Sequence, residues 1–481
     1  MSDDRQDTKR LSQIKPLDEA TIGAFSSKVQ GQLIRPKDDG YDEARTIFYG
    51  GFDRHPALIV RVADATDVSR VIALARESGL ELAVRSGGHS VAGHSTTEGG
   101  IVLDLSEMKN LEIDTEGRTA WAETGLTAGE YTAAVGAHGL ATGFGDTGSV
   151  GIGGVTLGGG VGYLVRKHGL TIDDVLAAEI VTADGELLRV DAESHPDLFW
   201  AIRGGGGNFG VVTRYHYRLH EVSTIVGGML VLPATPEVIA SFIAEAEAAP
   251  EELSTIANVM VAPPMPFLPA EAHGELIIMA MLCYAGEVET GERAIAPFRA
   301  LAEPIMDMVK PMPYPEIYPP EEGDYHPTAV GRTMFVDKID RDVAEVIVEY
   351  LLASDAVMRV AQLRVLGGAM ARVPAEATAF AHRSSPIMVN VAAFYEGPED
   401  LARREAWVTD FAAALRQCED GAYVGFLGEE GEGRVRDAYP GPTWERLAGI
   451  KGRYDPTNVF RLNQNIRPST QLESDAASAN R

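Results

Sequence analysis

The stretch GDTGSVGIGGVTLGGGVGYLVRKHGLTIDDVL, residues 145–176, contains the longest of three glycine clusters in this chain, Gly151–Gly162. The other two are RSGGHS at Arg85–Ser90 and GGGGNFG at Gly204–Gly210. Glycine adopts positive φ and lets backbone N–H groups approach a ligand without a Cβ in the way. Successive free N–H groups form concavities that bind anions such as a pyrophosphate. Three such loops predict a site for a large ligand with a phosphate bridge and a planar ring. The alternative is that they are tight turns and close chain crossings.

A GxGxxG string occurs in the third cluster, at Gly205, Gly207 and Gly210. A Rossmann fingerprint requires a strand before this string and a helix after it, so that the helix N-terminus faces the pyrophosphate. Here Leu198–Ile202 is predicted to be a short helix and Val211–Leu219 a strand, which is the reverse order. No glycine cluster is followed by the GK[ST] of a Walker loop. We therefore reject both nucleotide-binding motifs.

The composition is typical of a globular protein with two domains. At 481 residues the chain exceeds the size at which one hydrophobic core stops growing. Its 51 glycines among 481 residues are a larger share than the roughly 7% of average usage. The formal charge of −28 argues against nucleic acid and anionic membrane surfaces as partners, because both attract clustered Lys and Arg.

Targeting and cross-linking features are sparse. The opening residues, MSDDRQDTKR, are polar, and no apolar run of signal-peptide length follows them. No window approaches the ~18 apolar residues of a membrane span. Two cysteines, Cys283 and Cys418, are too few for a disulfide framework. We expect a cytoplasmic protein without a membrane segment, and nothing here predicts its oligomeric state.

Strands and helices are mixed without strict βαβ alternation. The helical spacing that starts at Val68 predicts a helix ending at Gly79. Thr127 and Glu130 form a predicted capping box. The run 180–190 has a DG turn between two apolar segments, which predicts a β-hairpin. Hairpins imply antiparallel pairing, so the pattern indicates an α+β fold class.

The composition changes near Val222, where the glycine clusters end. The next two hundred residues contain predicted helices and longer strands such as Leu276–Leu282 and Met388–Phe394, with a proline-rich loop at Pro311–Pro327. We therefore expect a second domain at 223–421, which leaves 1–222 and 422–481 on either side.

Four motifs taken together resemble the FAD-linked oxidases of the vanillyl-alcohol-oxidase superfamily, with its PCMH-type FAD-binding domain, and more narrowly the berberine-bridge-enzyme-like group. They are RSGGHSVAGHS (85–95), the stretch 145–176, RGGGGNFGVVT (203–213) and YDPTNVFRLNQNI (454–466). The middle of the chain matches only in outline. The resemblance implies that 1–222 and 422–481 form one FAD-binding domain. Residues 223–421 would then form an inserted substrate domain whose antiparallel sheet is covered by helices.

The resemblance also implies specific roles around the flavin. His89 would carry the 8α-carbon of FAD through a ring nitrogen. Bicovalent relatives add a cysteine, but Thr147 is aligned with it here, so a single attachment is predicted. Val150 occupies a position near flavin C4a where valine accompanies fast reaction with oxygen, which favours an oxidase. No metal is expected, because no His, Cys or carboxylate cluster accompanies His94.

The residues expected to bind FAD come from the three glycine clusters and their flanks. Ile180 and Val181 are expected at the adenine. The amides around Gln464 either contact the flavin or form a polar turn. The full set is Arg85, Ser86, Gly87, Gly88, His89, Ser90, Gly93, His94, Thr147, Gly148, Val150, Gly151, Gly153, Gly154, Gly158, Gly159, Gly160, Gly162, Ile180, Val181, Gly210, Val211, Val212, Asn463 and Asn465.

The substrate side is assigned by region only. Besides Val150, the candidate catalytic residues are Asn390, Tyr395 and Tyr423, with His326 and Arg332 as further candidates for a base; each of these is also compatible with a structural role. Plant relatives can use a glutamate in the strand that corresponds to Met388–Phe394. This strand, MVNVAAF, contains no acid, which argues against a carboxylate base.

The predicted function is oxidation of a small alcohol, sugar or amine by an FAD-linked enzyme that reduces oxygen to hydrogen peroxide. A dehydrogenase of the same family with a protein or quinone acceptor is the first alternative. A flavin-binding protein without turnover and a nucleotide-binding enzyme without flavin are the others. No sequence feature identifies the substrate.

Overall fold

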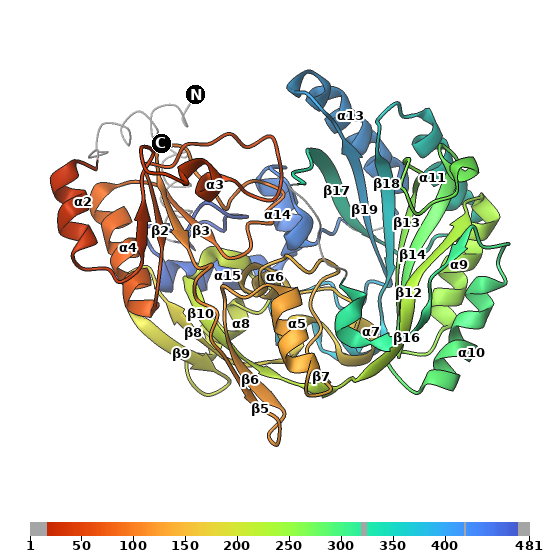
Figure 1. The fold of residues 1–481 in the computed structure, drawn as a ribbon. Helices are drawn as coiled ribbons and strands as arrows, with labels where there is room; N and C mark the ends of the chain where they lie inside the picture. Colours follow the sequence, from red (N-terminus) through yellow and green to blue (C-terminus); the bar gives the residue numbers. More distant parts are fainter. Residues whose placement is uncertain (1–16, 319–324, 418–419, 470–481) are drawn as a thin grey trace.

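The computed structural model describes residues 17–318, 325–417 and 420–469. Figure 1 shows two lobes side by side, one built mainly from the first half of the chain and the other dominated by a single large sheet. Residues 1–10 and Cys418 lie outside the described part, so the expectations for them are not addressed. Cys283 is a buried free thiol. No helix among the described residues is long and apolar enough to cross a membrane.

The first lobe begins with a four-stranded sheet in the order β1-β2-β4-β3. Its elements are α2 (Glu19–Ser26), β1 (Gln32–Ile34), α3 (Tyr41–Arg45), β2 (Leu58–Arg61), α4 (Ala65–Ser78), β3 (Leu82–Arg85) and β4 (Ile101–Asp104). Asp64 caps α4 by accepting the N–H of Asp67, and Gly79 ends the helix at φ +72°, which confirms the predicted stop. Because α4 returns the chain to the starting edge, β2 and β3 both run parallel to β4. This parallel unit departs from the antiparallel pairing that the sequence predicts.

Five antiparallel strands form the second sheet of this lobe, in the order β5-β6-β10-β8-β9. The strands are β5 (Leu111–Asp114), β6 (Thr119–Glu123), β8 (Val175–Val181), β9 (Leu187–Asp191) and β10 (Val211–Arg218); the helices are α5 (Ala128–Gly136), α6 (Ile152–Gly158), α7 (Val165–His168) and α8 (Pro196–Ala201). The β8–β9 hairpin and the Thr127–Glu130 capping box are confirmed. β7 (Leu140–Ala141) pairs with β11 (His220–Glu221), where the chain leaves this lobe.

The second lobe is one antiparallel sheet in the order β15-β12-β14-β13-β18-β19-β17, with β16 also paired to β12. Its strands are β12 (Thr224–Pro233), β13 (Leu253–Val261), β14 (Leu276–Tyr284), β15 (Met306–Asp307), β16 (Lys310–Pro313), β17 (Ala329–Val336), β18 (Arg359–Val365) and β19 (Ile387–Phe394); its helices are α9 (Pro236–Ala248), α10 (Val288–Arg299), α11 (Arg341–Ala353), α12 (Gly368–Arg372) and α13 (Pro398–Leu415). The main core lies between the sheet and α9, α10, α11 and α13. Alternate side chains therefore face the first lobe.

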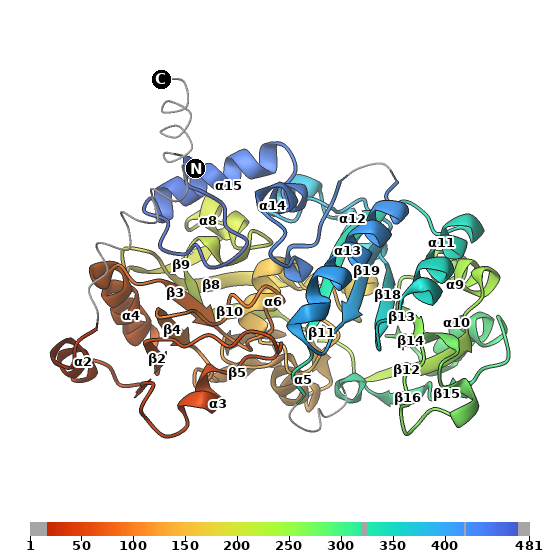
Figure 2. The ribbon, with the colours of Figure 1, turned by 90° about the horizontal axis from the view of Figure 1, so that it is seen from above.

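The chain then returns to the first lobe through α14 (Glu432–Ala438) and α15 (Pro442–Tyr454), and α15 lies beside α8 (Figure 2). Ala422, Trp444 and Leu447 are buried in the same core as residues of that sheet. The structure is thus an α+β fold of two lobes. The segment limits 1–222, 223–421 and 422–481 remain our proposed domain division.

Two predicted loops contain regular structure. Residues 152–158 of the second glycine cluster form α6, because their glycines let the helix lie against Ser86 and Thr124, where a Cβ on Gly153 would lie 3.1 Å from both. Part of the proline-rich segment is β16 and a short 3₁₀ turn, Tyr314–Ile317. Its prolines are tolerated because β16 pairs on one side only, with β12.

Candidate functional site

A cavity of about 830 Å³ opens between the two lobes. Its walls come from the three glycine clusters, the inner face of the large sheet and the returning tail. This volume lies within the roughly 300–1,000 Å³ typical of small-molecule and cofactor sites. The cavity therefore brings together the motifs that the sequence places far apart.

The first two glycine clusters cross each other at the cavity wall. A Cβ on Gly87 would lie 2.2 Å from the backbone nitrogen of Gly151, and a Cβ on Gly151 would lie 2.2 Å from that of Gly87. Gly154, in contrast, is exposed, and a Cβ added there would meet no atom within 4 Å. Some glycines thus permit a close packing of chains, whereas Gly154 presents bare backbone to the cavity.

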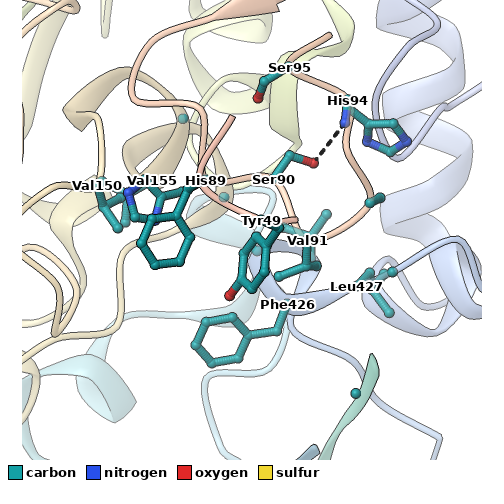
Figure 3. A pocket seen from close by; sticks show the side chains of 18 of the residues that line it. Tyr49, His89, Ser90, Val91, His94, Ser95, Val150, Val155, Phe426 and Leu427 are labelled. Atoms are coloured by element: carbon teal, nitrogen blue, oxygen red, sulfur yellow. Dashed lines mark hydrogen bonds between the residues drawn. The ribbon is translucent and has the colours of Figure 1, made fainter. Parts of the chain in front are cut away.

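His89 lines the cavity and is held from two sides. Its ring stacks on Phe48 with centroids 4.0 Å apart and an interplanar angle of 19°. Its Nε2 lies 2.8 Å from the hydroxyl oxygen of Ser149. Val150 and Val155 line the same cavity and are labelled with His89 in Figure 3. The imidazole therefore has a defined orientation at the wall formed by the first two clusters.

His94 also lines the cavity and lies apart from His89 in Figure 3. Its backbone N–H donates to the Ser90 hydroxyl at 3.2 Å. Burial, reinforced by the positive charge of Arg54, lowers the pKa of His94 to about 4, so its imidazole is neutral near pH 7. In the part of the chain that the structure describes, no group of three His, Cys, Asp or Glu residues could hold a metal ion.

The tail reaches the cavity beside the third glycine cluster. Asn463 donates to the Gly207 carbonyl at 3.0 Å, and Asn208 donates to the Gln464 carbonyl at 3.2 Å. The Oδ1 atoms of Asn463 and Asn465 are buried and accept no hydrogen bond from any described residue, and Asn463 lines the cavity. Buried acceptors normally have a donor, so the Asn463 oxygen fits a ligand that carries hydroxyl or N–H groups. With the bare glycine backbone, it makes the cavity compatible with FAD.

Most of the expected substrate-side residues line the same cavity. Asn390, Tyr395, Tyr423 and Arg332 do so, whereas His326 does not. A ring nitrogen of His326, Nδ1, instead lies 3.1 Å from the carbonyl oxygen of Phe48, which gives this histidine a structural contact.

The tyrosines at the cavity are suited to donating hydrogen bonds. Burial raises the pKa of Tyr49 to about 12, and it also raises the pKa of Tyr395 and Tyr423. All three phenols therefore stay protonated near neutral pH. The Tyr423 oxygen accepts the N–H of Gly160 at 3.1 Å, which fixes its position. These three phenols are therefore not strong bases at neutral pH.

Part of the expected FAD-binding set does not line the cavity. These residues are Arg85, Gly93, Gly148, Gly159, Gly160, Gly162, Ile180, Val181 and Asn465. Arg85 pairs with Asp104 at 2.8 Å instead. The glycines permit close crossings: a Cβ on Gly162 would lie 1.4 Å from the Phe144 carbonyl oxygen. Ile180 and Val181 are fully buried in apolar cores, and their expected place near an adenine stays a prediction.

Other residues at the site belong to no sequence motif, so the sequence alone did not identify them as part of the site. Phe48 and Tyr49 lie well before the first glycine cluster, and Phe426 lies on a 3₁₀ turn, Val424–Phe426, after the second lobe. Ser149 adjoins Val150 within the quoted stretch, but only the fold shows that it contacts His89.

Two family sequence models match this chain. The one described as "FAD binding domain" matches residues 56–191, and the one described as "Berberine and berberine like" matches residues 422–467. With the fold and the cavity, these matches define the class of protein as an FAD-binding oxidoreductase built from two domains.

Similar proteins match along nearly the whole chain. (R)-6-hydroxynicotine oxidase of Paenarthrobacter nicotinovorans is 30% identical over 458 residues, which cover 92% of this chain and 97% of that protein. Xylooligosaccharide oxidase of Thermothelomyces thermophilus is 27% identical, covering 86% and 88%. The crystal structure of 6-hydroxy-D-nicotine oxidase from Arthrobacter nicotinovorans superimposes with a TM-score of 0.81 and 28% identity, covering 92% and 98%. The chain belongs to the berberine-bridge-enzyme-like family of FAD-linked oxidoreductases, within the vanillyl-alcohol-oxidase superfamily.

Proposed function

We propose that this protein is an oxidase that binds FAD through one covalent bond to His89 and oxidises a small alcohol, sugar or amine with oxygen. The observation that carries this proposal is the position of His89, whose imidazole is held by Phe48 and Ser149 at the wall of the inter-lobe cavity. An imidazole held between the crossing of two glycine clusters and the open cavity is suited to attachment at the edge of a planar ring.

Bound FAD would supply the transfer of two electrons from the substrate to oxygen. The substrate would lose two protons with these electrons, and oxygen would leave as hydrogen peroxide. The chain would position both partners: the bare backbone of Gly154 and the acceptor oxygen of Asn463 would hold the cofactor. Asn390 and the protonated phenol of Tyr423 hold the substrate's reacting group.

Two residues of the quoted stretch support the finer points. Thr147 lines the cavity where bicovalent relatives have a cysteine, and a hydroxyl forms no bond of that kind, which supports a single attachment. Val150 also lines the cavity, and its short side chain leaves room for oxygen. We therefore favour oxygen over a protein or quinone as the electron acceptor.

Acid precipitation of the purified holoprotein tests the attachment. We expect the yellow colour to remain in the pellet of the natural protein and to move to the supernatant in the His89→Ala variant. Colour that leaves the pellet of the natural protein would disprove the covalent bond. A colourless preparation from riboflavin-rich medium would disprove flavin binding altogether.

The acceptor is tested separately on the reduced enzyme. We expect reoxidation by oxygen to release one hydrogen peroxide per flavin and to be at least as fast as reoxidation by an artificial dye. A reduced flavin that persists in air but is reoxidised by the dye would identify a dehydrogenase. Alcohols, sugars and amines that all fail to bleach the flavin under nitrogen would argue against turnover.

A further inference from the structure

The second lobe turns a row of neutral amides toward the cavity. Asn258, Gln362 and Asn390 are register partners on the neighbouring strands β13, β18 and β19. Gln362 donates to the Asn258 oxygen at 3.0 Å and accepts from the Arg364 guanidinium at 2.9 Å. All three amides line the cavity. This row offers hydrogen bonds but no net charge to a bound substrate.

Beside this row, the cavity wall is apolar and rich in methionine. Met265, Met279 and Met358 are half-buried and line the cavity, together with the buried Met260. Val360 is the register partner of Met260 and continues the surface. Thioether side chains adapt to the shape of an apolar ligand. Apolar surface turned into a cavity gains free energy when such a ligand displaces water from it.

Gly331 adjoins Asn390 at the cavity wall. Gly331 on β17 is the register partner of Ala392 on β19, and both line the cavity. A Cβ on Gly331 would lie 3.1 Å from the Val391 carbonyl oxygen and 3.5 Å from the Asn390 side-chain oxygen. The absence of a side chain at Gly331 thus keeps the Asn390 carboxamide accessible to the reacting hydroxyl of a substrate.

The charged residues of this lobe along the cavity are paired or peripheral. Arg364 contacts Asp146 at 2.5 Å, and Arg332 contacts Glu430 at 3.3 Å. Among the described residues of this lobe that line the cavity, the remaining charged residue is Glu405, which is exposed on α13. A cationic substrate would therefore lose hydration in the cavity without gaining an unpaired carboxylate beside the amide row.

We propose that the second lobe selects an uncharged alcohol with a mainly apolar body over cationic amines and saccharides. The hydroxyl lies beside Asn390 and Gly331, and the apolar body lies against the methionines. A saccharide would leave most of its hydroxyls facing thioethers. This proposal rests on the proposed function and narrows its substrate class.

Ligands that cannot be oxidised test the selection without turnover. 2-Phenyl-2-propanol and 2-phenylpropan-2-amine have the same shape and no hydrogen on the reacting carbon, and only the amine is cationic at pH 7. Methyl β-xyloside serves as the saccharide. Their dissociation constants are measured by titrating the flavin absorbance of the oxidised holoenzyme. We expect the alcohol to bind at least tenfold more tightly than the amine and the xyloside.

Equal or tighter binding of the amine or the xyloside would overturn the proposal, as would no binding of the alcohol. The proposed function is judged apart, by anaerobic bleaching with benzyl alcohol, benzylamine and xylobiose. Bleaching by benzylamine or xylobiose alone would support the proposed oxidoreductase activity and overturn the proposed substrate class. Tight binding of the tertiary alcohol without bleaching by any of the three compounds would support the proposed substrate pocket and contradict the proposed enzymatic activity.

Near-isosteric variants test the methionine wall. Met279→Gln and Met358→Gln replace the thioether by a carboxamide, and we expect each to weaken binding of 2-phenyl-2-propanol by about threefold to tenfold. Met308, 52% exposed on the same lobe and outside the cavity, provides the control Met308→Gln, which is expected to bind like the natural protein. Unchanged binding in both cavity variants, with melting temperatures near that of the natural protein, would contradict the methionine contact.

Discussion

At the scale of single residues, the orientation of His89 depends on a neighbour from another loop. Ser149 lies sixty positions later in the chain, yet its hydroxyl is 2.8 Å from Nε2 of His89. The partner of one imidazole nitrogen determines which tautomer forms and which nitrogen is presented elsewhere. We therefore expect Ser149 to position His89 so that the proposed attachment uses its other ring nitrogen.

Replacement of Ser149 by alanine tests this positioning role. We expect Ser149→Ala to bind FAD but to attach it covalently at least fivefold more slowly, because the imidazole loses its orienting contact. The measurement is the flavin fraction retained in the acid pellet over time after apoprotein is mixed with FAD. Ser69→Ala, which removes a hydroxyl that donates to the Gly185 carbonyl, serves as the control. An attachment rate equal to that of the natural protein would exclude the role.

At the scale of elements, one buried lysine joins α15 to the tail and to the third glycine cluster. Lys451 donates to Asp455 at 2.7 Å, to the Asn208 carbonyl at 2.7 Å and to the Phe460 carbonyl at 2.8 Å. Burial lowers the pKa of Lys451 to about 8, although Asp455 acts in the opposite direction. The ammonium group is therefore still charged at pH 7. It holds the segment that brings Asn463 to the cavity.

Loss of this ammonium group is expected to destabilise the protein strongly. Lys451→Met leaves Asp455 buried without a partner, which costs about 3–5 kcal/mol. Arg453→Met on the same helix breaks the exposed pair with Asp197 and the contact of the guanidinium with the Tyr454 ring, and it is expected to cost at most about 1 kcal/mol. Urea unfolding followed by tryptophan fluorescence measures both. Equal destabilisation by the two variants would show that the buried network contributes no more than a surface pair.

At the scale of the whole molecule, buried arginines connect the two lobes. Arg166 on α7 donates to the carbonyls of Ala246, Ala249 and Leu253. Arg364 on β18 contacts Asp146 and donates to the Val161 carbonyl at 2.8 Å. These contacts join the two lobes, so they hold the large sheet opposite the glycine clusters.

A histidine pair near β11, where the chain leaves the first lobe, makes the free energy of unfolding depend on pH. His168 stacks on His220 with centroids 3.8 Å apart. Burial, with the positive charges of His220 and Lys167, lowers the pKa of His168 from 6.5 to about 3. Between these values the unfolded chain binds the proton and the folded chain does not. Folding stability therefore falls as pH decreases from about 6.5 toward 3.

His168→Phe keeps an aromatic ring in the stack and removes the titration. At pH 5 the linkage accounts for at most about 2 kcal/mol, because the folded pKa lies well below that pH. We expect the melting temperature of the variant relative to the natural protein to rise as pH is lowered from 7.5 to 5. His138→Phe, at an exposed position, is the control. A difference that does not change with pH would show that His168 does not contribute.

Features that depend on nearby residues were predictable from the sequence. The Thr127–Glu130 capping box, the stop at Gly79 and the β8–β9 hairpin each follow from side chains within a few positions, and all three are confirmed. The reversed context of the GxGxxG string is confirmed for the same reason. The family and its α+β fold were predictable from the order of the four motifs, because the spacing of residues within each motif is local and is read directly from the sequence.

Contacts between distant segments required the tertiary structure. Glycine at position 162 predicts either a ligand contact or a chain crossing, and only the neighbouring Phe144 carbonyl decides for the crossing. Likewise, the approach of Ser149 to His89, and of the β13, β18 and β19 amides to one cavity, depends on strand order and lobe packing. Spacing along the chain determines which backbone shapes are possible, whereas the packed core determines which segments meet.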